Sequence, residues 1–332
     1  MAHARVPVAF LALIIGLSGP ALAQTIAVPP VATDTSTASD LIATGKDQAL
    51  RMTVPVMVNG LGPFQFVVDT GADRTVISVE LADRLGLPRA GTAKLHAMGG
   101  SATVKLVRID TVQVSTNIAR RVEAAALPKR YVGADGLLGV DSLKGQRIVM
   151  DFVANSMRVE PASAPEEAVP ADADVIIVTA QTRLGQLVMV DADANGQKIW
   201  VVVDTGAQNS IANSRLRALL VKRVPETEIK PINLVDVLGR NTPADYTIVS
   251  RLRIGGIAMG NAAIAFADAH PFRLFGLSKK PSMLLGVESL RSFRRVSVDF
   301  ATRKVKFLLP EEGSMGVAPP IIAVQDPALS KG

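Results

Sequence analysis

The chain carries the same four residues twice, and both copies contain a carboxylate. Residues 69–72 and residues 204–207 read Asp-Thr-Gly-Ala, and each copy follows a run of apolar residues. For a single copy, a strand-to-turn junction is the simplest explanation, because Gly permits the turn while Asp and Thr bond the local backbone. At average residue usage such a run arises by chance on the order of 0.01 times in a chain of this length. Two copies therefore indicate that Asp69 and Asp204 form a functional pair.

Brought together, two such carboxylates could perform acid–base chemistry on water. Close carboxylates cannot both ionise easily, so they share one proton and titrate as a unit. The ionised partner can activate a water molecule while the protonated partner polarises a carbonyl group. This chemistry requires neither a metal ion nor a cofactor, and a single loop cannot perform it. The fold must therefore bring Asp69 and Asp204 to one place.

A second apolar element follows each copy in the same order. It consists of Leu137, Leu138 and Gly139 in the first half of the chain, and of Leu284, Leu285 and Gly286 in the second. Together the two elements resemble those of the retropepsin-like aspartic peptidases, with two such lobes fused in one chain. The resemblance covers roughly residues 50–308. It implies an all-β fold of two β-barrel lobes with a few short helices, related by a pseudo-twofold axis.

The resemblance also implies roles for the residues beside the two aspartates, which are Thr70, Gly71, Ala72, Thr205, Gly206 and Ala207. The two glycines would let the backbone approach the carboxylates and bond them through N–H groups. The two threonines would hydrogen-bond across the lobe interface and hold the loops rigid. The two alanines stand where many pepsin-like enzymes have a hydroxyl residue that stabilises the carboxylate. Alanine lacks that donor, so we expect activity nearer neutral pH rather than activity confined to strong acid.

Short strands and helices are expected to position each aspartate. Apolar residues alternate along residues 52–58, and an Asn-Gly pair at residues 59–60 predicts a tight turn into the strand that ends before Asp69. Residues 187–203 repeat this arrangement with a second Asn-Gly pair. A short helix capped by Ser78 is predicted after the first motif, and a second at residues 213–221.

Two further hairpins are expected to cover the site. Their predicted turns contain Met98, Gly99 and Gly100 in the first half, and Leu238 and Gly239 in the second. The resemblance implies that these hairpins are flaps that close over a peptide, although an ordinary Gly-Gly hairpin would look the same locally. An extended peptide or protein segment would pair with them as an added strand. Because the turns differ, we expect two non-equivalent halves of the cleft.

The second lobe is longer than the first between its two motifs. We place the extra length between residues 262 and 282, around His270, and interpret it as a surface loop rather than as part of a substrate pocket.

The N-terminal residues predict export. Arg5 supplies a positive charge, residues 6–17 are apolar, and residues 21–23 read Ala-Leu-Ala, as at a signal-peptide cleavage site. A membrane anchor is the alternative, but the apolar stretch is short for a span. We expect a periplasmic protein, or else a secreted one, without a stable membrane anchor after cleavage.

Composition shifts suggest the boundaries between domains. The segment after the signal peptide is polar, and a Pro-rich segment separates the two lobes. This linker and the unequal lobes favour lobes that pair within one chain, and hence a monomer. The predicted parts are a signal peptide 1–23, a flexible segment 24–45, a first lobe 46–160, a linker 161–174, a second lobe 175–309 and a disordered tail 310–332.

Composition also excludes several classes of chemistry. The chain has no Cys, which excludes disulfides, thiol chemistry and cysteine-ligated metals. His96 and His270 are far apart in the sequence, so we expect neither a His-based zinc site nor a catalytic triad, and no metal or cofactor. The formal net charge is +6, from scattered basic residues, and only 4% of residues are aromatic, so we expect no nucleic-acid binding.

Two alternatives to an aspartic endopeptidase are considered. A catalytically silent peptide-binding protein of the same fold would have no need of a costly buried pair of carboxylates. A glycoside hydrolase with two carboxylates would need no repeated Asp-Thr-Gly and usually has an aromatic-lined cleft, whereas this chain has one Trp. The sequence therefore favours an endopeptidase that uses Asp69 and Asp204.

Overall fold

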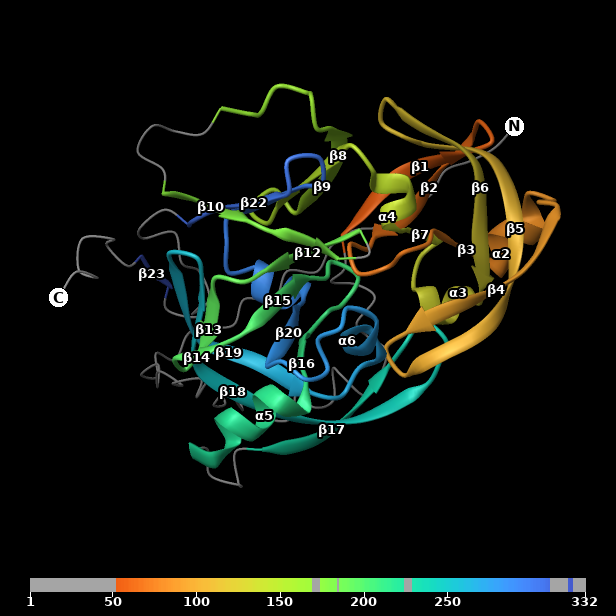
Figure 1. Cartoon of the computed structure of the whole chain (residues 1–332). Helices are drawn as coiled ribbons and strands as arrows, with labels where there is room; N and C mark the ends of the chain where they lie inside the picture. The colour runs from red at the N-terminus through yellow and green to blue at the C-terminus, as the bar shows by residue number, and fades with distance from the viewer. Residues whose placement is uncertain (1–51, 169–173, 184, 224–228, 311–321, 325–332) are drawn as a thin grey trace, which may run out of the picture. The chain divides into compact units, whose positions relative to one another are not determined.

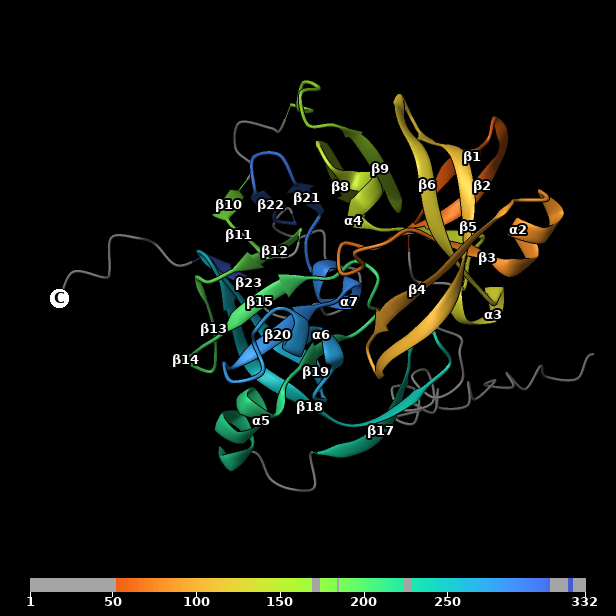
Figure 2. The same cartoon turned by 45° about the vertical axis from the view of Figure 1, so that its right-hand side comes forward.

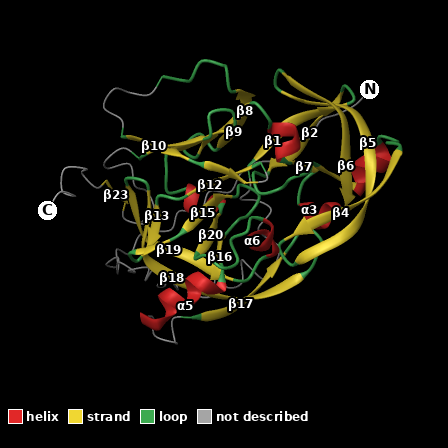
Figure 3. Ribbon diagram, viewed as in Figure 1, coloured by secondary structure: helices red, strands yellow, loops and turns green. Residues whose placement is uncertain are grey.

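A computed structural model describes residues 52–168, 174–183, 185–223, 229–310 and 322–324. The predicted signal peptide and N-terminal segment lie outside these residues, as do parts of the predicted linker and tail. In the described part strands dominate and the helices are short, which confirms the all-β prediction (Figure 3). No helix in these ranges is long and apolar enough to cross a membrane.

The strands of the first half (residues 52–138) form one sheet whose members are β1 (Thr53–Val58), β2 (Leu61–Val68), β3 (Val76–Ser78), β4 (Arg89–Ala97), β5 (Gly100–Val114), β6 (Asn117–Leu127) and β7 (Gly136–Leu138). Their order is β1-β2-β7-β3-β6-β5-β4, and β1 also pairs with β5, so that the sheet closes into a barrel. In β1, Val54, Val56 and Val58 are buried and alternate with less buried residues, because successive side chains of a strand face opposite sides. Short helices α2 (Val79–Arg84), α3 (Lys129–Val132) and α4 (Val140–Leu143) connect the strands.

The second half repeats this arrangement with shorter, more broken strands. The strands are β11 (Gln181–Arg183), β12 (Gln186–Met189), β13 (Ala192–Ala194), β14 (Gln197–Lys198), β15 (Trp200–Val203), β16 (Ser210–Ala212), β17 (Lys230–Val235), β18 (Asn241–Ile254), β19 (Ile257–Phe266), β20 (Ser282–Leu285) and β23 (Ile322–Val324). The order β15-β20-β16-β19-β18 reproduces β2-β7-β3-β6-β5 of the first half. The helices are α5 (Ser214–Leu220), the 3-10 turn η2 (Val221–Arg223), α6 (His270–Leu274) and α7 (Val287–Leu290).

A third sheet joins the two halves. It contains β8 (Gln146–Asp151), β9 (Ser156–Pro161), β10 (Val175–Thr179), β21 (Arg295–Asp299) and β22 (Lys304–Leu308), in the order β10-β22-β21-β8-β9. β8 of the first half pairs antiparallel with β21 of the second. The two halves therefore share a continuous ladder of backbone hydrogen bonds within one chain. Figure 1 shows β8, β9, β10 and β22 of this sheet, and Figure 2 also labels β21.

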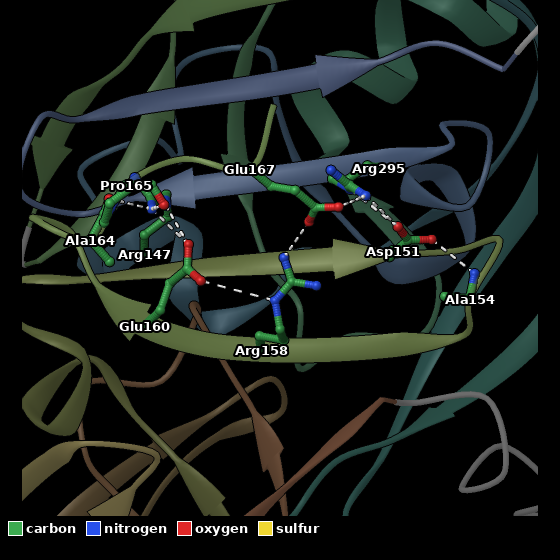
Figure 4. A network of polar contacts seen from close by, with 9 residues as sticks. All are labelled: Arg147, Asp151, Ala154, Arg158, Glu160, Ala164, Pro165, Glu167 and Arg295. Carbon is green, nitrogen blue, oxygen red and sulfur yellow. Dashed lines mark hydrogen bonds and ion pairs between the residues drawn. The ribbon is translucent and has the colours of Figure 1, made fainter. Parts of the chain in front are cut away.

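Ion pairs fasten part of the predicted linker to this sheet. The guanidinium of Arg295 bonds Asp151 across the β8–β21 pair at 2.9 Å and also reaches Glu167 at 3.1 Å (Figure 4). The buried Arg147 bonds Glu160 at 2.7 Å and the carbonyl oxygen of Ala164 at 2.9 Å. Residues 162–168, which belong to the predicted linker, are therefore tied to the sheet. Within the predicted tail, β23 pairs with β19 at the edge of the second sheet.

The predicted turns and helices are present in both halves. Asn59 and Gly60 have φ of 52° and 77°, and Asn195 and Gly196 have φ of 48° and 79°, as a tight hairpin turn with left-handed residues requires. Helix α2 begins after Ser78, whose hydroxyl accepts the N–H of Leu81 at 3.2 Å, and α5 begins after the cap Asn213 in the same way. These elements fix the ends of the strands that lead to and from each Asp-Thr-Gly-Ala loop.

Candidate active site

Each aspartate stands at the end of a strand that is flanked by a Leu-Leu-Gly strand. β2 runs parallel to β7, and β15 runs parallel to β20. The backbone N–H of Asp69 donates to the carbonyl of Leu138 at 3.0 Å, and that of Asp204 donates to Leu285 at 3.0 Å. In each half, the strand that leads into Asp-Thr-Gly-Ala and the Leu-Leu-Gly strand are thus neighbours. The Leu-Leu-Gly strand supports the backbone of the aspartate.

The glycine of each Leu-Leu-Gly element packs against the loop that follows the aspartate. A Cβ atom on Gly139 would lie 2.6 Å from the backbone of Arg74, and one on Gly286 would lie 2.5 Å from the backbone of Asn209. Neither backbone can move away cheaply, because both belong to the loops that carry the aspartates. The requirement for glycine at these positions is therefore steric.

Two hydroxyl groups that the sequence analysis missed bind the same elements together. The Thr75 hydroxyl accepts the N–H of Gly139 at 3.3 Å, and the Ser210 hydroxyl accepts the N–H of Gly286 at 3.1 Å. Both residues follow their aspartate at the same offset, which is the signal that could have identified them. Thr75 also donates to the carboxylate of Asp141 at 2.7 Å, so that the loop is anchored on α4.

The backbone of each loop stabilises its own carboxylate. Asp69 Oδ1 accepts the N–H groups of Gly71 at 2.8 Å and Ala72 at 3.0 Å. Asp204 Oδ1 accepts the corresponding glycine and alanine N–H groups at 3.2 and 3.1 Å. The alanine side chains cannot add a hydroxyl donor, so each carboxylate relies on backbone amides for these bonds.

The two Asp-Thr-Gly-Ala loops lie so close together that neither glycine has room for a Cβ atom. A Cβ atom on Gly206 would lie 2.1 Å from the carboxyl carbon of Asp69, and one on Gly71 would lie 2.7 Å from that of Asp204. Each predicted glycine therefore packs against the carboxylate of the opposite loop, as well as bonding its own.

Thr70 and Thr205 join the loops through four hydrogen bonds. The Thr70 hydroxyl donates to the carbonyl of Val203 at 2.7 Å and accepts the N–H of Thr205 at 3.1 Å. The Thr205 hydroxyl donates to the carbonyl of Val68 at 2.7 Å and accepts the N–H of Thr70 at 3.1 Å. Both threonines are buried, so this reciprocal set of bonds is shielded from water and fixes the separation of the aspartates.

The carboxyl groups of Asp69 and Asp204 interact directly. They share a hydrogen bond, and burial, together with the charge of Asp69, raises the pKa of Asp204 from 3.8 to about 8. The N–H groups of Ala207 and Gly206 oppose this increase because they favour the ionised form. Near neutral pH the pair therefore holds one proton, which is the state that can act as acid and base at once.

The aspartates lie in the lining of a cavity of about 260 Å³. Apolar side chains of both halves line it next to them, namely Val76, Leu95, Leu137, Ile211, Leu234 and Leu284. Since Val76 and Ile211, and likewise Leu137 and Leu284, occupy equivalent positions of the two halves, the walls follow the internal repeat.

The two predicted hairpins meet at this cavity. We call residues 89–114 (β4–β5) flap 1 and residues 230–254 (β17–β18) flap 2. The N–H of Gly99 in flap 1 donates to the carboxylate of Asp236 in flap 2 at 2.9 Å. Arg240 of flap 2 in turn donates to the carbonyl of Ser101 in flap 1 at 2.9 Å. Asp236, which the sequence analysis did not select, is buried and connects the two tips.

The remaining predicted flap residues contact short helices of the opposite half. Met98 of flap 1 lines the cavity, and its carbonyl accepts the N–H of His270 in α6 at 2.8 Å. In flap 2, Leu238 packs against the apolar cluster of the first half, and a Cβ atom on Gly239 would lie 2.5 Å from the ring of Tyr131 in α3. Figure 1 shows α6 at the end of the β4–β5 hairpin. Gly100 completes the turn of flap 1 with φ of 134°.

The extra residues of the second half are therefore more than a surface loop. They include α6, whose His270 contacts flap 1 and whose Pro271 lines the cavity. Our interpretation of the extra length as a surface loop, rather than as part of a pocket, was wrong, because α6 packs against the tip of the opposite hairpin and its Pro271 lines the cavity.

The two histidines that are distant in sequence are neighbours in space. His96 Nδ1 and His270 Nε2 are 2.7 Å apart. Sequence separation was therefore a poor reason to treat them as unrelated. Among the described residues, no group of three or more His, Asp or Glu side chains is arranged to hold a metal ion.

Comparisons with known proteins match both halves to protease families. Residues 54–145 match the family described as gag-polyprotein putative aspartyl protease, and residues 190–289 match the family described as aspartyl protease. A more distant similarity is to DNA damage-inducible protein 1 of Kluyveromyces lactis, at 29% identity over 134 residues. This alignment covers 38% of the chain and 31% of that protein, so the chain spans under a third of the relative's length. Both matched ranges contain an Asp-Thr-Gly-Ala loop and a Leu-Leu-Gly element.

Proposed function

We propose that this chain is an endopeptidase, because it belongs to the retropepsin-like aspartyl proteases and carries two such domains in tandem. Asp69 and Asp204 would be its catalytic residues. The observation that carries the proposal is the meeting of the two carboxyl groups across the two loops, each held by backbone amides and packed against the other loop's glycine. A pair of carboxyl groups that holds one proton near neutral pH has the protonation state that acid–base hydrolysis requires.

The proposed reaction uses water as the nucleophile. The ionised carboxylate takes a proton from a water molecule while the water oxygen attacks the peptide carbonyl carbon. The protonated carboxyl gives its proton to the carbonyl oxygen, so that a neutral tetrahedral diol forms. The carboxyl group that took the water proton then passes it to the peptide nitrogen, while the other carboxylate takes a proton from a hydroxyl group of the diol. The C–N bond breaks and the C=O double bond of the new acid forms. Each carboxyl group changes its protonation state once in each direction, which suits a pair with a shared proton.

The substrate would be an extended polypeptide segment. The apolar walls next to the aspartates favour apolar side chains on either side of the cleaved bond. Since flap 1 and flap 2 bond to each other through Gly99 and Asp236, at least one of them must move for a segment to enter. The N-terminal sequence and the shared β8–β21 ladder support two further proposals, export from the cytoplasm and function as a monomer.

Cleavage of casein by the chain from Gln24 onward, measured across pH, tests the proposal. Asp204→Asn keeps the size of the side chain and removes the shared proton, so turnover should fall by at least about a thousandfold. Asp83→Asn, at an exposed position of α2, makes the same chemical change away from the cavity and should leave turnover unchanged. Wild-type protein that binds an unstructured peptide but cleaves it at no pH would instead indicate a peptide-binding protein.

A further inference from the structure

The contact between flap 1 and α6 contains a pair of imidazoles. His96 lies on β4 and His270 begins α6, and the facing nitrogens are 2.7 Å apart. The rings are nearly parallel, with an angle of 9° between their planes, and their centroids are 4.9 Å apart. Because the nitrogens are so much closer than the centroids, the rings meet edge to edge, in the orientation of an N–H···N hydrogen bond.

A third side chain determines which nitrogen carries the proton. The guanidinium of Arg273 lies 3.0 Å from His270 Nδ1, and a guanidinium can only donate. His270 Nδ1 must therefore be an acceptor, which leaves the proton of the neutral ring on Nε2. That proton points at His96 Nδ1, so His96 must accept there and carry its own proton on Nε2. The chain of bonds from Arg273 through His270 to His96 therefore requires two neutral imidazoles.

Protonating either ring breaks this chain of bonds. A proton on His96 Nδ1 would face the N–H of His270, and a proton on His270 Nδ1 would face the N–H of Arg273. The surroundings of His270 also disfavour its protonation. Burial lowers the pKa of His270, and the neighbouring His96, Arg273 and Lys94 lower it further. On β5 the residue opposite His96 is the uncharged Ser101, while Asp236 and Arg240 of flap 2 bond Gly99 and Ser101.

We propose that His96 and His270 form a pH-sensitive latch, which holds flap 1 on α6 while both rings are neutral and releases it when either ring is protonated. The latch lies beside the cavity, and its backbone partner is the bond from the His270 N–H to the carbonyl of Met98. Flap 1 would thus close over the cavity near neutral pH and open as the pH falls. For the proposed endopeptidase this would weaken the grip on substrate in acid, independently of the aspartates.

Proton linkage gives the size of the effect. An imidazole with an ordinary pKa of about 6.5 in the open state, and unable to take a proton in the closed state, shifts the equilibrium about tenfold toward open between about pH 7.5 and about pH 5.5. Because both rings of the latch behave in this way, the combined shift is about a hundredfold. The sign follows from the closed state, which binds fewer protons than the open one. The closed flap is therefore favoured at the higher pH and disfavoured at the lower.

Side-chain ¹⁵N spectra and amide-exchange protection factors of the full chain test the latch without requiring turnover. At about pH 7.5 both rings should be neutral with the proton on Nε2. Lowering the pH to about 5.5 should reduce the protection of the His270 amide about a hundredfold. His96→Gln offers an acceptor for the His270 N–H and takes up no proton itself, so only His270 remains to titrate and the protection should fall about tenfold. Lys94→Gln, which leaves both rings intact, should retain the wild-type response.

The Leu238 amide is the internal control. It bonds the same Asp236 carboxylate as Gly99 but belongs to flap 2, so it should keep its protection at both pH values. A proton on Nδ1 of either neutral ring would overturn the latch, as would wild-type protection that does not change. An equal loss in His96→Gln, or a parallel loss at Leu238, would assign the response to another group and overturn it equally. None of these results depends on whether the protein cleaves peptides.

Discussion

Gly206→Ala is the substitution that most directly tests the close approach of the two loops. The added Cβ atom would lie 2.1 Å from the carboxyl carbon of Asp69 and 2.2 Å from its Oδ2 atom. Gly206 does not have a positive φ, so alanine can adopt its backbone conformation. Any effect must therefore come from the contact with Asp69 rather than from backbone strain.

The size of the effect follows from these distances. Unbonded carbon atoms lie about 3.5 Å apart or more, so the carboxylate or the loop must move by more than about 1 Å. That movement would break the bonds of Asp69 to the amides of Gly71 at 2.8 Å and Ala72 at 3.0 Å. A misplacement of about 1 Å at reacting groups can cost about a hundredfold in rate. We therefore expect kcat/KM to fall by at least about a hundredfold, or about 2.7 kcal/mol.

The assay is peptide cleavage at the optimum pH, with the unfolding midpoint in urea measured in parallel. Gly256→Ala is the matched control, because its Cβ atom would meet only Ile176 Cδ1, at an ordinary 3.6 Å. It should change kcat/KM by less than about twofold. If folded Gly206→Ala retained a third of the wild-type activity, or if Gly256→Ala lost as much, the argument from loop proximity would be refuted.

Two further predictions concern the same loops. Thr205→Val removes a hydroxyl that donates to Val68 and accepts from Thr70. It leaves two buried backbone groups unsatisfied, so urea unfolding should show a loss of about 2–4 kcal/mol, while Thr205→Ser, which keeps the hydroxyl, should lose less than half as much. An equal loss in both variants would mean that the methyl group matters and the bonds do not. The second prediction concerns pH: because burial and Asp69 raise the pKa of Asp204 to about 8, the proton needed for catalysis is present below that pH and lost above it. The value of kcat should fall about tenfold per pH unit in the alkaline range, and a flat profile there would contradict the shared proton.

Local requirements of the backbone made much of the site predictable. Asp69 and Asp204 are recognisable because each lies between an apolar strand and a glycine turn, and the Leu-Leu-Gly elements recur in the same order. Ser78 indicated a helix cap because the capping bond spans only three residues. In each case the residues that interact are close in sequence, or belong to a pattern that the chain repeats.

Contacts that join unrelated segments were not predictable in this way. Asp236 was passed over because its partner, the amide of Gly99, lies 137 residues away. The importance of α6 was missed for the same reason, since its contacts are with the hairpin of the other half. The contact between Tyr131 and Gly239 has no signal in the sequence, because the two residues belong to different halves of the chain.

The sequence by itself determined the all-β class, the two Asp-Thr-Gly-Ala loops and the short elements beside them, because turns, caps and strand alternation depend on neighbouring residues. Only the tertiary structure decided that the threonines of the two loops exchange four hydrogen bonds, that the flaps bond each other, and that His96 and His270 meet although 174 residues separate them. Those contacts join the same two halves that the pairing of β8 with β21 joins. Such packing depends on the shapes of whole surfaces, which no short stretch of sequence specifies.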